Sequence, residues 1–300
     1  MKLIQLIAPL LLVPLCIAAG SVNIILVGDV GFNGTAKETR APNQERVASA
    51  MAEYVRSTRL KLDAVIIPGD VFKVKLKSTS DQAFQLGFEQ MYDANVLNAP
   101  FYTVLGNHDY DSGAAAVELK YAKDHPESRW KTRGPWYRVD LPQGKPIVSI
   151  LMLDSMKDKL SSADWKKQKA WMEAELAKPR NGAWMVCCAH KPFTSDGQHG
   201  DSQTIKSEFG PLLKKYDVGF YLAGHDHVLQ HARVVGWKTD FIISGGGGEN
   251  VNRPVNGHQA EFVKASAGFV HIEFGADTAK VKMIDAAGDV LYAFDRPARQ

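Results

Sequence analysis

Five short polar motifs, each directly after a run of apolar residues, constrain the fold of this 300-residue chain more than any other feature. The apolar runs are short and rich in β-branched or aromatic residues, which is typical of buried strands. The motifs are Gly28-Asp29, Gly69-Asp70, Gly106-Asn107-His108-Asp109, Ala189-His190 and Gly224-His225-Asp226-His227. Functional residues of α/β proteins lie at the carboxyl ends of strands, so strands that share one sheet would bring these motifs together at one edge.

The remaining sequence alternates between helical and strand patterns and then becomes rich in strands. Apolar residues at helical spacing predict helices at about 44–60, 81–93, 114–123, 162–177 and 204–216. Further strands are predicted at 228–235, 240–243, 268–274, 280–284 and 289–294. This order predicts an α/β fold with two packed sheets and helices outside them. No repeat or long linker interrupts it, so we expect a single domain over residues 21–300.

The first 20 residues have the pattern of a secretory signal peptide. Lys2 precedes an apolar stretch over residues 3–17, and three small residues follow. The stretch is short and contains two prolines, which argues against a membrane span. We expect cleavage near Ala18 or Gly20 and a product that is secreted or lies in the lumen of the endomembrane or lysosomal system.

Charge and cysteine content narrow the functional classes. The formal net charge is +3, which is too small to predict binding to nucleic acid or to a membrane surface. After the leader only Cys187 and Cys188 remain. A disulfide between neighbours in one strand would be strained, so two reduced core thiols are the expected state. Asn33, in the sequon Asn33-Gly34-Thr35, is a candidate for glycosylation.

The five motifs carry side chains that bind metal ions. Two carboxylates, one amide oxygen and several imidazoles suit a pair of di- or trivalent cations better than a proton-transfer triad. The candidate ligands are Asp29, Asp70, Asn107, His190, His225 and His227. Two cations about 3.5–4 Å apart would clamp a phosphate and activate a water between them.

The ordered set of motifs resembles the metallophosphoesterase superfamily and, within it, the small purple acid phosphatases of the tartrate-resistant type 5. The likeness extends over nearly the whole chain after the leader, including Trp136-Tyr137-Arg138 and the segment 281–284. This resemblance implies a four-layer αββα sandwich, the calcineurin-like fold, with a dinuclear metal site at one edge. It also implies a monomeric, metal-dependent acid phosphatase whose substrates are small phosphate monoesters, hydrolysed by attack of a metal-bound hydroxide.

The resemblance also implies a role for each matching residue. Asp70 matches the carboxylate that bridges both metals, while Asp29 and His227 match ligands of the first metal, which is ferric iron in the family. Asn107, His190 and His225 match ligands of the second metal, which is iron, zinc or manganese. With Asp70, the matching catalytic residues are His108 and His199, which would hold the phosphate or protonate the leaving oxygen. Asp109 and Asp226 are expected to orient ligands rather than to bind metal.

The first metal site departs from the family pattern at two positions. In the purple enzymes a tyrosine three residues after the bridging aspartate binds ferric iron, and this chain has Lys73 there. The wider superfamily has a histidine two residues after the first aspartate, and this chain has Gly31. An ammonium does not ligate a cation, so Lys73 should either turn outward or lose its proton. We expect it to turn outward, which leaves three protein ligands. We therefore expect the first site to bind its metal more weakly and the protein to lack the purple colour.

Two other functions stay open at this stage. A two-metal clamp also suits a phosphodiesterase or a nucleotide pyrophosphatase. Alternatively, the chain is a secreted metal- or phosphate-binding relative that has lost turnover. Lys73 favours this last reading, whereas His108 and His199 argue against it, because a binding protein needs no acid for a leaving group.

Overall fold

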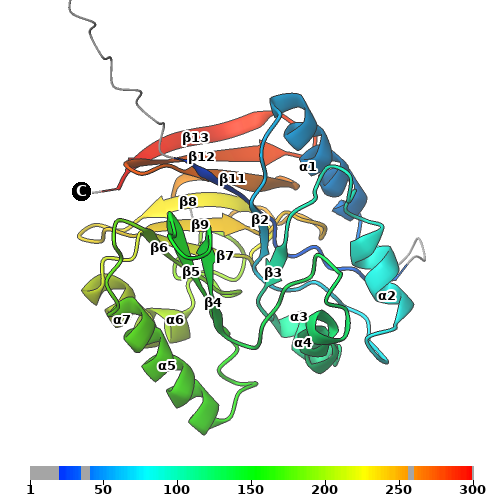
Figure 1. Ribbon diagram of the computed structural model, residues 1–300, viewed down its shortest axis with the longest axis horizontal. Helices are drawn as coiled ribbons and strands as arrows, with labels where there is room; N and C mark the ends of the chain where they lie inside the picture. The colour runs from blue at the N-terminus through cyan, green and yellow to red at the C-terminus, as the bar shows by residue number, and fades with distance from the viewer. Residues whose placement is uncertain (1–19, 35–40, 256–259, 299–300) are drawn as a thin grey trace, which may run out of the picture.

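The computed structural model describes residues 20–34, 41–255 and 260–298, so the expected leader lies outside the described residues except for Gly20. Two β-sheets pack face to face (Figure 1). The six-stranded sheet has the order β13 (Val290–Pro297), β12 (Thr278–Asp285), β11 (Gly268–Phe274), β1 (Val22–Leu26), β2 (Ala64–Ile67) and β3 (Phe101–Thr103). The seven-stranded sheet has the order β10 (Ala260–Lys264), β8 (Leu229–Arg233), β9 (Asp240–Ser244), β7 (Phe220–Ala223), β6 (Trp184–Cys188), β5 (Val148–Met152) and β4 (Tyr137–Leu141).

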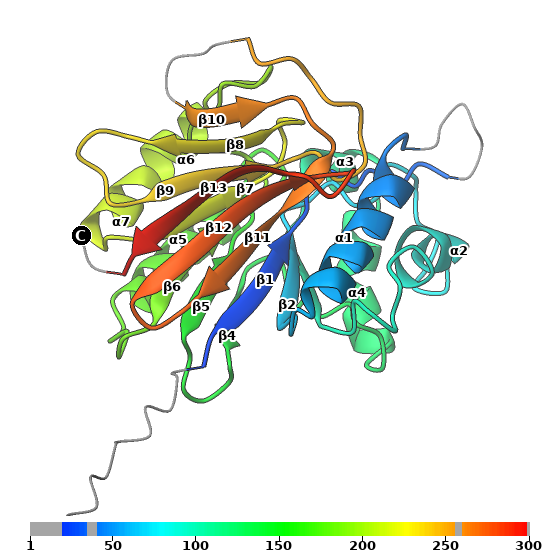
Figure 2. The same ribbon diagram turned by 90° about the horizontal axis from the view of Figure 1, so that it is seen from above.

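Helices form the two outer layers. The six-stranded sheet packs against α1 (Gln44–Thr58), α2 (Gln82–Phe84), the π-helical turn η1 (Gln85–Glu89) and α4 (Ala115–Asp124). The seven-stranded sheet packs against α5 (Ser162–Leu176), α6 (Gln203–Glu208) and α7 (Gly210–Lys215). A short helix, α3 (Asn107–Asp111), begins in the third motif. Figure 2 shows α1 beside β1 and β2. The αββα fold class is therefore confirmed.

Alternation along the strands explains why their apolar runs are continuous. In β1, Ile24 and Leu26 point into the core between the sheets, whereas Ile25 packs toward the helices of the outer layer. Because both faces of each strand are covered, every position is apolar instead of every second one. Cys188 and Cys187 of β6 divide in the same way between two cores, and both are free buried thiols.

The helix predictions were wrong at two places. The segment 81–93 contains only α2 and η1, and the expected helix at 204–216 is divided into α6 and α7. Pro211 lies in the first turn of α7, where its missing N–H costs no hydrogen bond, but a continuous helix would need that N–H. The edge strand β10 had no counterpart in the prediction.

The strands before the five motifs do not share one sheet, contrary to the simplest expectation. β1, β2 and β3 belong to the six-stranded sheet, and β6 and β7 belong to the other. Within each sheet these strands are parallel. The motifs still meet, because the two sheet edges join there: the N–H of Gly28 donates to the carbonyl of Ser244 at the end of β9, with an N–O distance of 2.7 Å.

Candidate metal centre

Three of the predicted ligands lie in strained backbone at the strand ends. Asp29, Asp70 and His225 have φ angles of 56°, 54° and 70°, a region that non-glycine residues rarely occupy. Each follows a glycine, and the space there is closed: a Cβ on Gly224 would lie 2.4 Å from Oδ2 of Asp29. Strain of about 1–3 kcal/mol per residue persists where surrounding contacts enforce it, and it clusters at functional sites.

The side chains of Asn107, His190 and His225, here called the second half of the site, converge on one point. Nε2 of His190 lies 3.0 Å from Oδ1 of Asn107 and 3.1 Å from Nδ1 of His225. It also lies 3.4 Å from Oδ2 of Asp70. The other ring nitrogen of His190, Nδ1, is 2.8 Å from the carbonyl of Pro68. A carbonyl only accepts, so Nδ1 carries the proton and Nε2 presents a lone pair.

Asp29 and His227 form the first half of the site, where a backbone carbonyl again fixes the tautomer of the histidine. Nδ1 of His227 donates to the carbonyl of Asn250 at 2.8 Å, so Nε2 again presents a lone pair. That atom lies 3.8 Å from Oδ1 of Asp29, which is buried and has no hydrogen-bond partner. Oδ2 of Asp29 accepts the backbone N–H of His225 at 2.8 Å. An orphaned buried carboxylate oxygen is costly unless a cation satisfies it.

Asp70 lies between the two halves. Single ligand atoms of Asp29, Asp70 and His190 all lie within 4.8 Å of one another. Lone pairs from Asp29, Asp70, Asn107, His190 and His227 thus face each other without enough donors to pair them. Such a set of oxygen and imidazole ligands fits two metal ions.

Burial favours the uncharged form of both the imidazoles and the carboxylates of the site. Burial lowers the pKa of His190 to about 4, so its imidazole is neutral at pH 7. Burial raises the pKa of Asp70 to about 6 and, together with the charge of Asp70, raises that of Asp29 well above 3.8. Both carboxylates are therefore costly to ionise until a cation is nearby.

Asp109 and Asp226 are placed as orienting residues. The carboxylate of Asp109 accepts the backbone N–H groups of Asp70, Val71, Phe72 and Gly106 at 2.8–3.0 Å. It thereby fixes the loops after β2 and β3 against each other. Asp226 accepts from the hydroxyl of Ser195 at 2.5 Å and from the N–H of His199 at 2.8 Å.

The two candidate acid histidines flank the site differently. His108 is half-buried, and its Nε2 lies 3.9 Å from Oδ2 of Asp70. His199 is exposed, and its ring stacks on that of His225 with 4.3 Å between centroids. Both therefore border the cluster of converging ligand atoms. Neither displaces a predicted ligand.

The expectation that Lys73 turns outward was wrong. Its side chain is 19% exposed, and Nζ lies 3.0 Å from Oε1 of Glu249, which is 15% exposed. The Lys73 ammonium points inward because it forms an ion pair with the Glu249 carboxylate. Sequence reasoning missed Glu249: it follows the run Gly245–Gly248 and belongs to no ligand motif.

The glycine run Gly245–Gly248 lets two loops of the site lie close together. A Cβ on Gly247 would lie 2.4 Å from the carbonyl of Gly28, and one on Gly248 would lie 2.0 Å from the carbonyl of Val30. Only glycine lets this backbone pass so close to the Asp29 loop. The loop therefore carries the following residue, Glu249, to the site.

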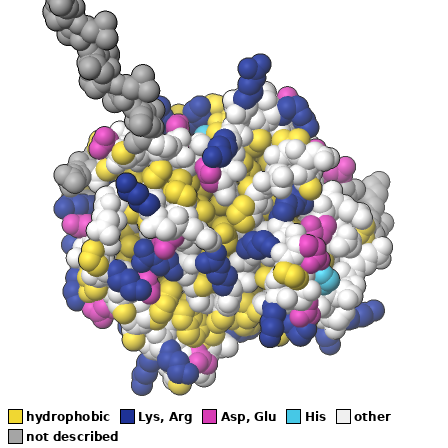
Figure 3. Space-filling view, in the orientation of Figure 1, with side chains coloured by type: hydrophobic (Ala, Val, Ile, Leu, Met, Phe, Trp, Pro, Cys, Tyr) yellow, Lys and Arg dark blue, Asp and Glu magenta, His cyan; other side chains and the backbone are white. Residues whose placement is uncertain are grey.

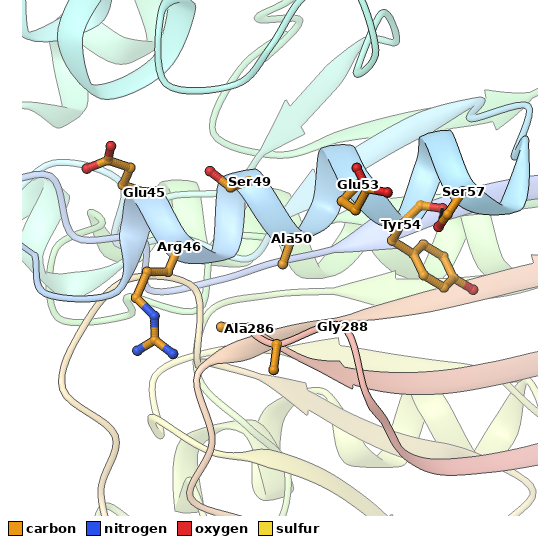
Figure 4. Close-up of a pocket in the computed structure, with 10 residues that line it drawn as sticks. Glu45, Arg46, Ser49, Ala50, Glu53, Tyr54, Ser57, Ala286 and Gly288 are labelled. Atoms are coloured by element: carbon orange, nitrogen blue, oxygen red, sulfur yellow. Dashed lines mark hydrogen bonds between the residues drawn. The ribbon is translucent and has the colours of Figure 1, made fainter.

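Two surface pockets lie away from the site. One, of about 650 Å³, lies between one face of α1 and the turn at Ala286–Gly288 (Figure 4). The other, of about 1010 Å³, is lined by Trp184 and Gly219 at the amino ends of β6 and β7, opposite the motifs. Asn33 is half-buried, and Thr35 of its sequon lies outside the described residues.

The surface charge is mixed on the face seen in Figure 3, where Lys and Arg side chains are spread among acidic and apolar ones. Over the described ranges, no helix is long and apolar enough to cross a bilayer.

Comparison with known proteins gives a consistent result. Residues 22–229 match the family model of the calcineurin-like phosphoesterases. The chain is 29% identical over 296 residues to purple acid phosphatase 17 of Arabidopsis thaliana, covering 91% of this chain and 83% of that protein. It is 27% identical over 324 residues to tartrate-resistant acid phosphatase type 5 of Rattus norvegicus, covering 97% and 96%.

Two solved structures share the fold. GAP50, described as the anchor in the inner membrane complex of Plasmodium, aligns with a TM-score of 0.76 at 20% identity, covering 93% of this chain and 90% of that one. Purple acid phosphatase PPD1 from yellow lupin aligns with a TM-score of 0.73 at 16% identity, covering 92% and 54%.

Proposed function

This chain belongs to the calcineurin-like phosphoesterase family, and from that premise we propose that it is a two-metal acid phosphatase that hydrolyses phosphate monoesters. The observation that carries the proposal is the convergence of unpaired lone pairs from both sheets on one edge. The similarity to purple and tartrate-resistant acid phosphatases supports the same reaction.

Asp70 would be shared by two cations, with Asp29 and His227 on one and Asn107, His190 and His225 on the other. Iron paired with iron, zinc or manganese suits these oxygen and imidazole ligands. Two such cations supply positive charge to the phosphate oxygens and an activated water as the attacking group.

His108 and His199 complete the reaction from the chain itself. After water attacks phosphorus, the bond to the ester oxygen breaks, and that oxygen needs a proton to leave as an alcohol. Half-buried His108, beside Asp70, is the residue that we propose donates it. His199, exposed and stacked on His225, would bind the phosphate. Burial lowers the pKa of His108 from its ordinary value, so its imidazole carries the proton needed for this step only in acid, and an acidic optimum follows.

We also propose that the mature protein is secreted or lumenal, monomeric and glycosylated at Asn33. The leader pattern of residues 1–20 supports secretion and the sequon supports glycosylation, whereas the monomeric state is what the family resemblance implies. Amino-terminal sequencing of the protein expressed in a eukaryotic secretory host should find a start near Ala19 or Ser21. A start at Met1, or full-length protein retained in the cytosol, would contradict this.

The proposed reaction is tested with para-nitrophenyl phosphate and its bis-ester from pH 4 to pH 8, with iron, zinc and manganese added back. We expect faster turnover of the monoester with an optimum below pH 7. His108→Ala should lower kcat by about 10²–10⁴-fold while the metal content stays the same. Faster turnover of the bis-ester would favour a phosphodiesterase, and no turnover with any metal would favour a binding protein.

A further inference from the structure

We propose that the carboxylate of Glu249 is a fourth protein ligand of the first cation, held in position by Lys73. The inference rests on the proposed two-metal site and adds to it a residue outside the five motifs. It would restore to the first half the hard anionic oxygen that the sequence there lacks.

The Glu249 side chain fills space that Gly31 leaves open. A Cβ on Gly31 would lie 1.9 Å from Oε1 of Glu249 and 2.6 Å from its Cδ. No larger residue at position 31 is compatible with this carboxylate. Gly31 is two residues after Asp29, so the carboxylate lies over the loop that carries the first ligand.

The backbone of Glu249 is fixed on the same loop. Its N–H donates to the carbonyl of Asp29 at 3.1 Å, and its own carbonyl accepts from Nδ2 of Asn43 at 2.9 Å. Two residues earlier, the N–H of Gly247 donates to the carbonyl of Gly28 at 2.9 Å. The side chain is therefore presented from a rigid support, as a ligand requires.

The side chain of Lys73 holds the Glu249 carboxylate in place. The backbone N–H of Lys73 donates to the carbonyl of Phe32 at 2.9 Å, which ties the loop after β2 to the loop after β1. Its ammonium pairs with Oε1 of Glu249 at 3.0 Å rather than with Asp29 or Asp70. A carboxylate has a second oxygen with lone pairs of its own. The lysine therefore orients Glu249 and does not take the place of the cation.

Glu249 and the first half of the site belong to one electrostatic cluster. Its charge acts on Asp29, Asp70 and His227. Asp29 is completely buried, and its Oδ1, 3.8 Å from Nε2 of His227, has no hydrogen-bond partner. Three carboxylates face a single ammonium, so one cation more would compensate the excess of negative charge.

The test is zinc binding to the mature protein, stripped of metal and then titrated in competition with a coloured chelator, with bound zinc counted by mass spectrometry. The wild type should bind two Zn²⁺ per chain. Glu249→Gln should keep one at unchanged affinity and bind the other at least about tenfold more weakly. The matched control is Glu175→Gln, which removes another partly buried carboxylate, paired with Arg138 at 3.1 Å. It should bind both ions like the wild type.

Lys73→Met separates this proposal from its rival, in which the ammonium replaces the first cation. The proposal predicts two Zn²⁺ per chain with and without Lys73. A wild type that binds one Zn²⁺ and gains a second in Lys73→Met would overturn it, as would Glu249→Gln with both affinities unchanged. The proposed function fails separately: if Glu249→Gln loses one ion but no phosphoester is hydrolysed by the wild type, Glu249 is still a ligand.

Discussion

The two halves of the metal centre are formed by different parts of the fold. In the second half, one imidazole nitrogen lies 3.0–3.4 Å from three other ligand atoms, all provided by motifs at the ends of strands. In the first half the two ligand atoms of Asp29 and His227 are 3.8 Å apart, and an ion pair lies beside them. The second half is thus assembled by the sheet edges themselves. The first depends on a loop that enters from elsewhere in the chain.

With Glu249 as the proposed ligand, this difference explains how a metal site can tolerate the loss of another. A strand end fixes the direction of a ligand side chain. Few other residues fit there, because each position is packed on both sides. A loop after a glycine run can bring a new carboxylate to the same place. We infer that Glu249, with Lys73 as its counter-ion, supplies a ligand oxygen in place of a missing phenolate, although the Lys73–Glu249 pair itself is neutral.

Asp70→Asn gives the largest expected effect, because it removes the negative charge shared by both halves. We expect loss of both cations and a fall in kcat/KM of at least about 10³-fold, since bound metals supply several kcal/mol of transition-state stabilisation. Metal counting and turnover of para-nitrophenyl phosphate measure it. Unchanged zinc content in Asp70→Asn would refute its bridging role.

Replacing one histidine from each half should separate them. His190→Ala should remove the second cation and leave the first, and His227→Ala should do the reverse. We expect His190→Ala to weaken binding of its cation more, because three ligand atoms lie 3.0–3.4 Å from Nε2 of His190, whereas Nε2 of His227 lies 3.8 Å from Oδ1 of Asp29. Zinc titration of each variant measures this. Loss of both ions in either variant would show that the halves are one inseparable unit.

Lys73→Tyr should give the first half a phenolate. The wild type loaded with iron should lack an absorption band in the 500–600 nm region, because carboxylates and imidazoles provide no such charge transfer. The variant should gain the band when its first site holds ferric iron. Lys73→Met, which removes the ammonium without adding a phenolate, is the colourless control. A band in the wild type would contradict the assigned ligand set.

The smallest expected effect is a pH response outside the site, which gives a reference for the imidazoles inside it. Nδ1 of His271 contacts the hydroxyl of Tyr54 at 2.9 Å, and its Nε2 contacts Oδ1 of Asn23 at 3.1 Å. Burial lowers its pKa to about 4, against about 6.5 in the unfolded chain. Above pH 6.5 neither state is protonated there. Between pH 6.5 and pH 4 only the unfolded state gains the proton, so the unfolding free energy falls.

The loss attributable to His271 is roughly 3 kcal/mol over that interval. His271→Gln should abolish it, so the difference between the variant and the wild type should change between pH 7 and pH 4. Denaturant unfolding at several pH values measures this. A constant difference over the interval would show that His271 contributes nothing to the acid response.

Much of this architecture could be predicted from the sequence, for a physical reason. The strands ending at Leu26, Ile67 and Cys188 are short apolar runs because both of their faces are buried, so the pattern locates them directly. A family resemblance then gave the αββα fold. The prediction of one helix at 204–216 was wrong because the apolar spacing continues through the break that Pro211 permits. The prediction at 81–93 was wrong because that segment, despite its helical spacing, contains a π-helical turn.

The site was predictable only where a motif carries its own ligands. Asn107 and His190 follow strands whose direction the sequence reveals. Glu249 follows four glycines, which reveal close backbone approach but not where the next side chain goes. The inward position of Lys73 depends on Glu249, 176 residues later in the sequence, so local reasoning about an unpaired ammonium led to the wrong orientation.

The most direct test is a crystal structure of the zinc-loaded mature protein, with anomalous scattering recorded at the zinc edge. We expect two peaks about 3.5–4 Å apart, on either side of Asp70. One should lie among Asn107, His190 and His225, and the other should contact Asp29, His227 and the carboxylate of Glu249. A single peak in the second half, with the Lys73 ammonium in the place of the first, would contradict it.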